Sequence, residues 1–550
     1  MQRVTAPGIS SAEWRWVIIF SGLLVAITLL PYAWAFASDS PSDNWQFMGM
    51  LPNPQDGATY LAKIGEGARG DWLFTLAYTS EPHAGAAINE FYLWLGHLSR
   101  ILGLSPLLMY HLSRLVTGFV MYISIYHLGS VIWPRLRPRR LFFGLIAVGS
   151  GLGWLALIFL SRSPGGSVDA QFLPTDFSIP ESIPFFSTFV NPHFPLAIAL
   201  IALLAATFVM VFRPGFNIEP NFTNGGASVA LVSIALCIVQ PQGWVPIAGA
   251  LCVYILILTL RSRRIPQLEL SWVLLVILPA IPFFLYYYAV IRDNGAMRAW
   301  NAQNLTPSPL PFNYIMGFGL LLVVALPGLW RGVRRFERDG DRLMLIWFVV
   351  NVIALYVPFS LQRRLAIGLI IPIVYFAVRA LEDSWFNWVS PKWRDAALVA
   401  LFVFIIPSNV LSLSIPLFGI LKPSAGIQNW QLLPADYNAA IQWLRDDAVQ
   451  NQVVLAPPRV SLWIPAYAYQ RVVYGHPFET LNAAAKLKEV NDWYTGKNCG
   501  ELLREYHVRY VLSGDFGALA MDDASDACLK TQQLDPPVAT FGNVSIYEVR

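Results

Sequence analysis

The chain has 550 residues, of which 55% are hydrophobic and 14% aromatic, while only 13% are charged. Soluble domains carry roughly 25% charged residues, so this composition excludes an ordinary soluble enzyme, and the abundance of apolar side chains excludes a disordered chain. A formal net charge of +4 gives no indication of a nucleic-acid partner, and four cysteines are too few for a disulfide scaffold. The composition therefore predicts a mainly α-helical, polytopic membrane protein.

Eleven segments are apolar over lengths comparable with the roughly 20 residues that cross a bilayer as a helix. The fifth and sixth are short, and Gln240-Pro241-Gln242-Gly243 between them predicts a tight break between two helices. The sequence therefore predicts eleven spans, or ten if this pair is one interrupted helix. The segments cover residues 15–37, 105–133, 141–160, 195–212, 226–240, 244–260, 270–291, 312–330, 342–360, 365–381 and 396–420.

Four clusters of arginine and lysine, called the basic clusters below, follow the second, sixth, eighth and tenth segments. Positively charged loops stay on the cytoplasmic side of a membrane. With eleven spans all four clusters lie on the side of the N-terminus, whereas with ten the last two change sides. We therefore expect eleven spans in a cell membrane, with the N-terminus cytoplasmic and the C-terminus outside. In chain order, the clusters contain Arg135, Arg137, Arg139 and Arg140; Arg261, Arg263 and Arg264; Arg331, Arg334, Arg335 and Arg338; Arg379, Lys392 and Arg394.

The first apolar segment ends in Ala33-Trp34-Ala35-Phe36-Ala37, which has the small-residue pattern of a signal-peptide cleavage site. The segment is longer than the usual apolar core of a signal peptide, and ten further spans follow it. An uncleaved first helix is therefore the preferred prediction, and cleavage is the alternative.

Three segments predicted outside the membrane are too long to be simple connectors. The first, 38–104, contains amphipathic patterns over 56–69 and 88–102, which predict helices lying in the membrane interface. In the first of these patterns the spacing places Asp56, Tyr60 and Lys63 on one face of the helix. The second, 161–194, is rich in proline and phenylalanine and carries several acids, and the third, 292–311, is polar.

The composition changes after residue 421, so we expect a transmembrane domain over 1–421 and an extracytoplasmic α/β domain over 422–550. Cys499 and Cys528 lie in the latter domain, where an oxidising exterior permits a disulfide. The tyrosine-rich segment around Gly475-His476-Pro477 is expected to be a packed loop, with a glycan-contacting surface as the alternative. The pattern predicts helices over 436–445, 486–494 and 501–506, strands over 452–456 and 508–512, and a hairpin of 538–541 and 544–549 turned at Gly542-Asn543.

The strongest local pattern lies in the first outside segment. Asp56 is followed four residues later by Tyr60, then by Gly70-Asp71-Trp72, Glu81-Pro82-His83 and Phe91-Tyr92. In order and approximate spacing this pattern resembles the glycosyltransferase C superfamily, membrane enzymes that use polyprenyl-phosphate-linked sugars, and most of all its protein O-mannosyltransferases and aminoarabinose transferases. The layout of spans followed by an outside α/β domain is similar too. Glu81-Pro82-His83 departs from the family pattern, because it lacks the basic residue that often follows the acid.

Asp56 is the predicted catalytic residue. Transfer of a sugar from a phosphate requires a base for the acceptor proton but no acid for the leaving group, so one carboxylate suffices, whereas glycoside hydrolysis usually needs two. The alternative role for Asp56 is a helix cap, because Asp is favoured at helix starts. Asp39 and Asp43 are competing candidates, and Glu81 is expected either to position the acceptor or base or to be a turn residue.

Arg363 and Arg364 are the predicted ligands of the donor phosphate. They lie between the ninth and tenth spans, on the side where the basic clusters are absent, and arginine pairs bidentately with phosphate. Anchoring in the lipid headgroups is the alternative. His193, at an outside helix start, is expected to bind phosphate or acceptor, or else to be a packing residue.

Four further residues are assigned to a cavity or acceptor site: Tyr60, His83, Gln240 and Gln242. For the two glutamines, the alternative is hydrogen bonding to backbone groups that the helix break leaves free. We expect no cofactor, and the spacing of the acids indicates no metal site, with a divalent cation on outside acids as an alternative.

The sequence thus predicts an inverting membrane glycosyltransferase. Its partners would be a polyprenyl-phosphate-linked sugar, an extracytoplasmic acceptor (lipid, glycan or protein) and membrane lipids, and no nucleic acid. One alternative is a transporter or flippase of lipid-linked sugars, which the absence of a convincing internal repeat disfavours. The other is a non-catalytic envelope assembly protein, which would not require Asp56.

Overall fold

The computed structural model describes residues 8–38, 45–160, 173–337, 340–421, 430–514, 524–532, 534 and 536–549. Within these residues, nine helical segments are long and apolar enough to cross a membrane. The chain is therefore a mainly α-helical, multi-pass membrane protein, as predicted. Asp39 and Asp43 lie outside the described residues.

Every predicted span contains a helix, but two of these helices are short. The helices α10 (Gly226–Val239) and α16 (Asp341–Ala354) have 14 residues each. At about 1.5 Å per residue such a helix is about 21 Å long, less than the roughly 30 Å hydrocarbon core. The nine long segments are α1 (Ser11–Ala37), α4 (Pro106–Ile132), α5–α6 (Leu136–Val148 and Gly153–Leu160), α9 (His193–Val211), α11 (Pro241–Ser262), α12–α13 (Gln267–Ile277 and Ile281–Asp293), α15 (Pro311–Arg335), η5–α17–α18 (Gln362–Ala366, Ile370–Ala380 and Phe386–Trp388) and α19–α20 (Arg394–Ile405 and Pro407–Ile420).

The chain divides into two compact units. The first unit consists of Met1–Thr28, Ser113–Tyr286 and Thr306–Leu413, and the second of Leu29–Leu112, Tyr287–Leu305 and Ser414–Arg550. The second unit thus combines the first outside segment with the C-terminal part of the chain. The domain boundary at residue 422 stays a prediction from composition.

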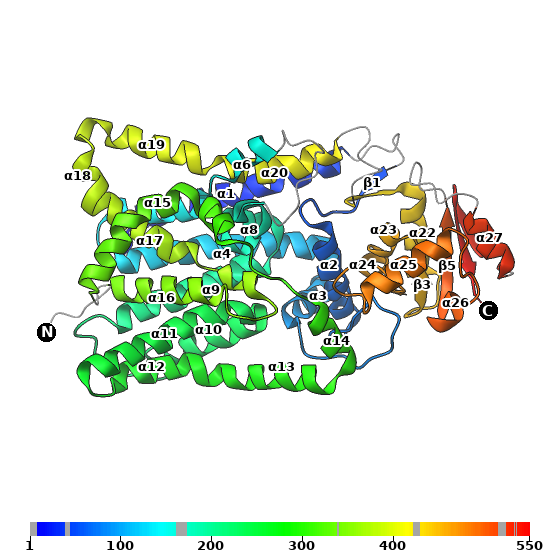
Figure 1. Ribbon diagram of the computed structural model, residues 1–550, viewed down its shortest axis with the longest axis horizontal. Helices are drawn as coiled ribbons and strands as arrows, with labels where there is room; N and C mark the ends of the chain where they lie inside the picture. The colour runs from blue at the N-terminus through cyan, green and yellow to red at the C-terminus, as the bar shows by residue number, and fades with distance from the viewer. Residues whose placement is uncertain are drawn as a thin grey trace. The chain divides into compact units, whose positions relative to one another are not determined.

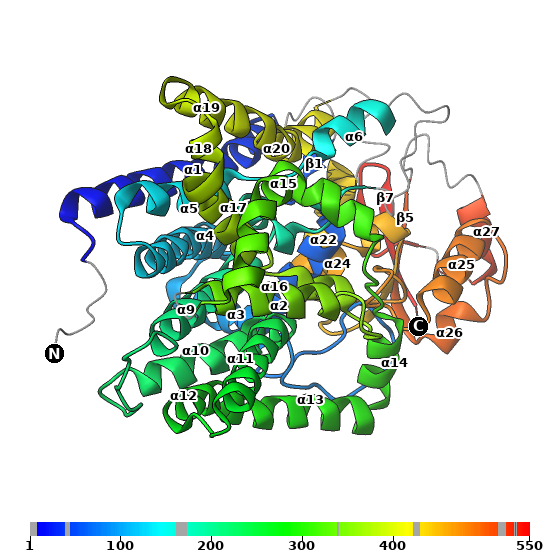
Figure 2. The same ribbon diagram turned by 60° about the vertical axis from the view of Figure 1, so that its left-hand side comes forward.

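The first unit is built from packed apolar helices. In it α15 packs on α17, α11 on α16, and α9 on α10, and the two ribbon views show the last pair side by side (Figures 1 and 2). The predicted break is confirmed, because α10 ends at Val239, Gln240 adopts a non-helical conformation and α11 begins at Pro241. Arg114 is fully buried in α4 and donates hydrogen bonds to Thr28 and to the carbonyl of Thr188.

The two amphipathic patterns of the first outside segment are the helices α2 (Pro54–Arg69) and α3 (Glu90–Leu102), and their existence is confirmed. In the second unit α2 packs between α3 and α24 (Ile464–Tyr467) (Figure 1). A Cβ atom on Gly67 would lie 2.1 Å from the Leu93 carbonyl oxygen, and one on Gly96 would lie 2.2 Å from that of Ile64. The backbones of α2 and α3 therefore touch where only glycine fits.

The burial of α2 corrects the expectation that it lies in the membrane interface. All residues from Gly57 to Gly67 are buried by protein, so both its polar and its apolar faces have protein neighbours. In contrast, α3 exposes Trp94, Leu98 and Ile101, which leaves it one apolar face for an interface.

The third outside segment is also more ordered than its polar composition suggested. The helix α14 (Gly295–Gln303) lies within it, and the Asn294 side chain accepts hydrogen bonds from the backbone N–H groups of Ala296 and Met297. Met297 is fully buried in a small cluster with Phe74 and Leu481. One apolar side chain thus fixes this helix on the second unit.

The C-terminal part of the second unit is an α/β structure around a five-stranded sheet. Its strand order is β4-β3-β5-β7-β6, in which β3 pairs in parallel with β4 and β5, and the last two pairings are antiparallel. The predicted helices, strands and terminal hairpin are confirmed, whereas β2 (Leu432–Pro434), α23 (Pro458–Ser461), α24, β4 and α27 were not predicted. The elements are α22 (Ala435–Asp446), β3 (Val453–Leu455), β4 (Arg471–Val472), α25 (Ala483–Tyr494), α26 (Leu502–Glu505), β5 (Val508–Gly514), α27 (Ala524–Thr531), β6 (Ala539–Phe541) and β7 (Val544–Glu548).

Both faces of this sheet are covered, as the alternation along β3 shows. Val454 points into a cluster that includes residues of α2 and α22, while Val453 and Leu455 point into a second cluster with Trp493 of α25. Cys499 and Cys528 form a disulfide beside this second cluster, with their Cα atoms 5.0 Å apart. The disulfide fastens α27 to the turn that follows α25.

Candidate functional site

Asp56 is the third residue of α2, directly after a sharp turn in the chain. Asn53 has φ of 46° and ψ of 64°, and Pro54 then starts the helix with its fixed φ. The Asn53 side-chain amide donates to Oδ2 of Asp56 at 2.5 Å. The Asp56 side chain is 30% exposed, so it is part of the helix start and is also open to solvent. Its position therefore suits both the cap and the base that the sequence predicted.

On its other side, Asp56 faces His476. Nε2 of His476 lies 3.7 Å from Oδ1 of Asp56. Nδ1 of the same ring accepts the backbone N–H groups of Phe478 and Glu479, both at 3.1 Å. The imidazole is almost fully buried, and its Nε2 makes no hydrogen bond to any residue that the structure describes.

The turn that carries His476 is held by the hydroxyl of Thr480. This oxygen accepts the backbone N–H groups of Gly475 and His476 at 3.2 and 3.1 Å, and it donates to the carbonyl of Tyr78 at 2.7 Å. Tyr78 in turn donates from its hydroxyl to the carbonyl of Leu462. The predicted packed loop is thus the arrangement found, and its neighbours come from the first outside segment.

A buried ion pair joins the same two regions. Nζ of Lys63 lies 2.5 Å from Oε1 of Glu479, and both side chains are at least nine-tenths buried. Lys63 lies two turns after Asp56 on the face of α2 that the spacing of Asp56, Tyr60 and Lys63 predicted. Because a buried charge is costly without its partner, this pair fixes α2 against the loop that contains His476.

Glu66 is a second buried acid of α2. Thr75 donates to it from both its backbone N–H and its hydroxyl. Burial raises the pKa of Glu66 to about 7, in spite of these hydrogen bonds and the charges of Arg69 and Lys63. This carboxyl therefore titrates near neutral pH.

Glu81 lies in an ion pair. Lys486 of α25 approaches it at 2.7 Å, and the Thr79 hydroxyl also donates to it. Burial acts to raise the pKa of Glu81, but the Lys486 and Thr79 hydrogen bonds and the Lys486 charge outweigh it, so the pKa lies below its usual value. This environment weakens Glu81 as a base, and its predicted positioning role stays a prediction.

Tyr60 and His83 are both occupied by packing or backbone contacts. The Tyr60 ring is buried and stacks on Tyr92, with the ring centres 4.3 Å apart. Nε2 of His83 accepts the backbone N–H of Leu76 at 2.9 Å, and Nδ1 lies 2.9 Å from the Glu81 carbonyl. Both residues shape the first outside segment, and an acceptor-binding role for them stays a prediction.

The predicted phosphate ligands belong to the first unit. Arg363 lies in η5, where its backbone N–H donates to the carbonyl of Thr306 at 3.1 Å. Its Nε is buried and makes no hydrogen bond within the described part of the chain. Arg364 is half-buried beside it, and His193 is buried at the start of α9 with its ring 4.0 Å from that of Phe194. The Nε–H of Arg363 is thus a buried donor that a ligand could satisfy.

Gln240 is buried at the helix break, and its Nε2 makes no hydrogen bond within the described residues, whereas Gln242 is half-buried. The side-chain nitrogen of Gln240 therefore does not bond the freed backbone, while for both glutamines the cavity role and backbone hydrogen bonding stay alternative predictions. Among the described residues, no group of three His, Cys, Asp or Glu side chains is placed to hold a metal ion.

Sequence reasoning did not single out two features of these sites. Asp176, in the second outside segment, is fully buried and accepts the backbone N–H of Gly153 at 3.1 Å. His476 was noted only within a loop, because nothing in its local pattern indicates a partner more than 400 residues earlier. The spacing of Asp56 and Lys63 was the available signal, since it placed both on the face of α2 that the loop covers.

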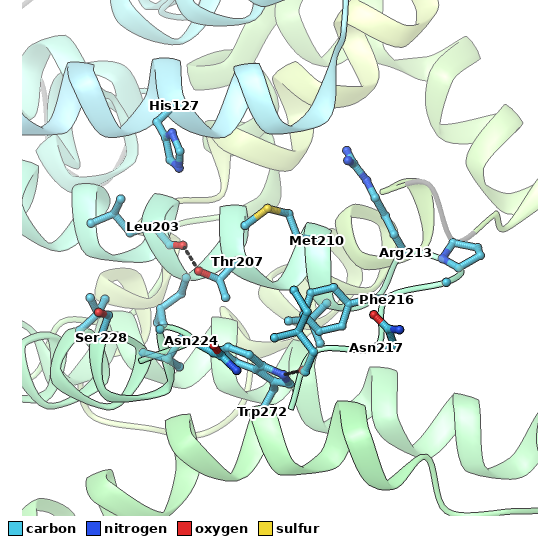
Figure 3. A pocket seen from close by; sticks show the side chains of 18 residues that line it. His127, Leu203, Thr207, Met210, Arg213, Phe216, Asn217, Asn224, Ser228 and Trp272 are labelled. Atoms are coloured by element: carbon cyan, nitrogen blue, oxygen red, sulfur yellow. Dashed lines mark hydrogen bonds between the residues drawn. The ribbon is translucent and has the colours of Figure 1, made fainter. Parts of the chain in front are cut away.

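The first unit contains a cavity of about 890 Å³ away from these residues. It lies between α4, the end of α9, the start of α10 and α12, and the residues that line it include none of the predicted site residues. Figure 3 shows His127 directed toward it from α4, and Thr207 and Met210 from α9. The cavity is therefore not the predicted sugar-transfer site.

No family model and no curated protein matches the sequence. Three solved structures are similar in fold. ArnT from Cupriavidus metallidurans in the apo state has 14% sequence identity and a TM-score of 0.55, over 98% of this chain and 99% of that chain. The apo oligosaccharyltransferase of Archaeoglobus fulgidus has 14% identity and a TM-score of 0.54, over 92% and 70%. The arabinofuranosyltransferase AftD from Mycobacteria has 13% identity and a TM-score of 0.53, over 99% and 42%.

These similarities extend over nearly the whole chain and include both its helices and its C-terminal part. The chain therefore shares the fold of these three proteins, as the resemblance implied. At such low identity the similarity is one of fold, and the activity is argued separately below.

Proposed function

We propose that the protein is an inverting glycosyltransferase of the cell membrane. It would transfer a sugar from a polyprenyl-phosphate carrier to an acceptor outside the cytoplasm, with Asp56 as the general base. Two of the similar structures are named as enzymes that transfer an oligosaccharide or an arabinofuranose, which supports a transferase on this fold. The proposed orientation, with the N-terminus cytoplasmic and the C-terminal domain outside, rests on the basic clusters.

The proposed reaction is a single displacement at the anomeric carbon. The acceptor hydroxyl oxygen forms a bond to this carbon as the bond to the phosphate oxygen breaks, so the configuration inverts. The acceptor proton passes to the Asp56 carboxylate, and the electron pair of the broken bond leaves with the polyprenyl phosphate. The phosphate is a good leaving group and needs no proton, so one base is sufficient.

The observation that carries the proposal is the placement of Asp56. It combines solvent exposure with a carboxylate oriented by Asn53 on one side and facing His476 on the other. Glu81, the other acid predicted for catalysis, is instead neutralised by Lys486. Both side chains are partly exposed, 30% for Asp56 and 37% for Glu81, so the ion pair of Glu81 with Lys486 is the difference that favours Asp56 as the base.

For the donor phosphate we propose Arg363 and Arg364. The support is the buried Nε of Arg363, which makes no hydrogen bond within the described residues, because an unsatisfied guanidinium N–H is costly until a phosphate oxygen accepts it. Arg363→Ala should therefore weaken binding of polyprenyl phosphate in a vesicle-binding assay, while the exposed Arg264→Ala should not. Equal binding by both variants would refute this assignment.

The test of the base uses purified protein in nanodiscs and short-chain polyprenyl phosphates carrying single hexoses or pentoses. Release of polyprenyl phosphate and gain of mass by simple alkyl glycoside or peptide acceptors are followed by mass spectrometry. Asp56→Asn should lower the rate by about 10²–10⁴-fold, the usual value of a general base. Asp446→Asn, at an exposed aspartate of α22, is the matched control for loss of one charge.

Near-normal transfer by Asp56→Asn would return Asp56 to a capping role. A wild type that releases polyprenyl phosphate from none of the donors would overturn the enzyme proposal in favour of a transporter or assembly protein. Each variant must first insert and purify like the wild type.

A further inference from the structure

We propose that His476 is the positioning residue of Asp56. Its Nε2–H would hold Oδ1 of the carboxylate, so that the remaining lone pairs point at the acceptor hydroxyl. This inference rests on the proposed function, because it assigns a partner to the base of that reaction. It makes the loop at residues 475–480 part of the catalytic apparatus.

The hydrogen bonds of the ring determine which nitrogen carries the proton. Nδ1 accepts two backbone N–H groups, from Phe478 and Glu479, so it cannot itself carry a hydrogen. In a neutral imidazole the single proton then lies on Nε2. The turn thus selects the tautomer whose N–H is directed toward Asp56.

The position of this N–H is fixed from several sides. The Thr480 hydroxyl accepts the backbone N–H groups of Gly475 and His476, and the neighbouring Glu479 forms an ion pair with Lys63 of α2. Asp56 lies on the same helix as Lys63. The ion pair therefore sets the distance between the turn and the start of α2.

The separation of 3.7 Å between Nε2 and Oδ1 is longer than a hydrogen bond. Catalytic hydrogen bonds are often long before the substrate binds and shorten in the complex, or they include one water molecule. When the buried N–H comes within hydrogen-bonding distance of the carboxylate, the new hydrogen bond satisfies the N–H and lowers the free energy of the complex. The geometry therefore favours a fixed orientation of the Asp56 carboxylate in the complex with donor and acceptor.

A purely structural role of His476 requires only the Nδ1 atom of the ring. The turn uses Nδ1, and it would be equally well served by an asparagine, whose side-chain oxygen can take the place of Nδ1. The positioning role uses Nε2, which the amide nitrogen of a glutamine can approach. The structural role of Nδ1 and the positioning role of Nε2 can therefore be tested by separate substitutions.

The experiment compares His476→Asn with His476→Gln in nanodiscs, using the donors that the wild type accepts. If His476 positions Asp56, His476→Asn should lower kcat by about 10- to 100-fold, the effect expected when a reacting group is misplaced by about 1 Å. The KM for the donor should stay nearly constant, and His476→Gln should retain more activity than His476→Asn. The reverse order, with His476→Asn near wild type and His476→Gln impaired, would overturn the proposal.

A double variant separates this inference from the proposal on which it rests. If His476 acts through Asp56, then Asp56→Asn combined with His476→Asn should be no slower than Asp56→Asn alone. Additive losses would refute a role through Asp56. If Asp56→Asn is inactive and His476→Asn is fully active, only the positioning role is overturned. If Asp56→Asn is active, the proposed base itself is overturned. Thermal unfolding of each variant excludes loss of the fold as the cause.

Discussion

The buried carboxyl of Glu66 makes the stability of the second unit depend on pH, and Glu66→Gln should remove this dependence. In the folded protein the pKa of Glu66 is about 7, whereas the ordinary value is 4.5, because burial disfavours the ionised form. Between these values the folded state binds more protons than the unfolded state. The free energy of unfolding therefore falls as the pH rises from about 4.5 to 7 and then levels off.

The size of the effect follows from the difference between the two pKa values. Each pKa unit corresponds to about 1.4 kcal/mol, so ionised Glu66 lowers the free energy of unfolding by about 3 kcal/mol above pH 7. A glutamine cannot ionise, and its oxygen can accept the backbone N–H of Thr75 while its amide nitrogen donates to the Thr75 hydroxyl, which then acts as the acceptor. The free energy of unfolding of Glu66→Gln should thus be close to that of the wild type at pH 5 and about 3 kcal/mol higher at pH 8.

Thermal or denaturant unfolding followed by intrinsic fluorescence between pH 5 and pH 8.5 measures this difference. Glu505→Gln, at an exposed glutamate of the same unit, controls for the loss of one negative charge. A stability difference between Glu66→Gln and wild type that is the same at both ends of the range would refute the argument. So would a variant that is less stable at pH 8.

Three other predictions concern the second unit and the topology. Lys63→Met should lower the free energy of unfolding by about 3–5 kcal/mol, because it leaves the buried carboxylate of Glu479 without the charge of Lys63. Adding Glu479→Leu should restore most of this loss, and denaturant unfolding measures both changes. Replacing Cys499 and Cys528 by serine should cost about 3–4 kcal/mol in the chain-entropy model, and free thiols in peptides of the unreduced wild type would contradict this pairing. Reporter fusions placed after the first three basic clusters should be cytoplasmic, and one after residue 424, which lies between the described ranges 340–421 and 430–514, should be outside. A cytoplasmic signal from the last fusion would overturn the eleven-span topology.

Local patterns were sufficient for the helices and most of the strands. The apolar segments, the amphipathic spacing of α2 and the Gly542-Asn543 turn each depend on residues that are neighbours in the sequence. The burial of α2 could not be predicted in this way, because its polar face is covered by a loop near residue 476. A lysine on an amphipathic helix gives the same pattern whether it meets solvent or a distant glutamate.

The candidate site shows the same limit. Asp56 could be named from a short motif, and Lys63 from its place on the same helix face. The roles of Glu81 and His83 were harder to judge, because a carboxylate paired with Lys486 and one open to an acceptor have the same local sequence. His476 could not be assigned to Asp56, since the hydrogen bonds that select its tautomer exist only once the turn has formed.

The contact between Lys63 and Glu479 also has a consequence for the synthesis of the protein. The two residues are separated by 416 positions, and a ribosome adds about 5–20 residues per second. For about 20–80 s after Lys63 is made, α2 therefore lacks the residues that bury its charges, while the helices between them are still being inserted. During this interval α2 lacks its contacts with the loop at residues 475–480, and Asp56 can reach its final environment only when the segment around His476 and Glu479 has emerged.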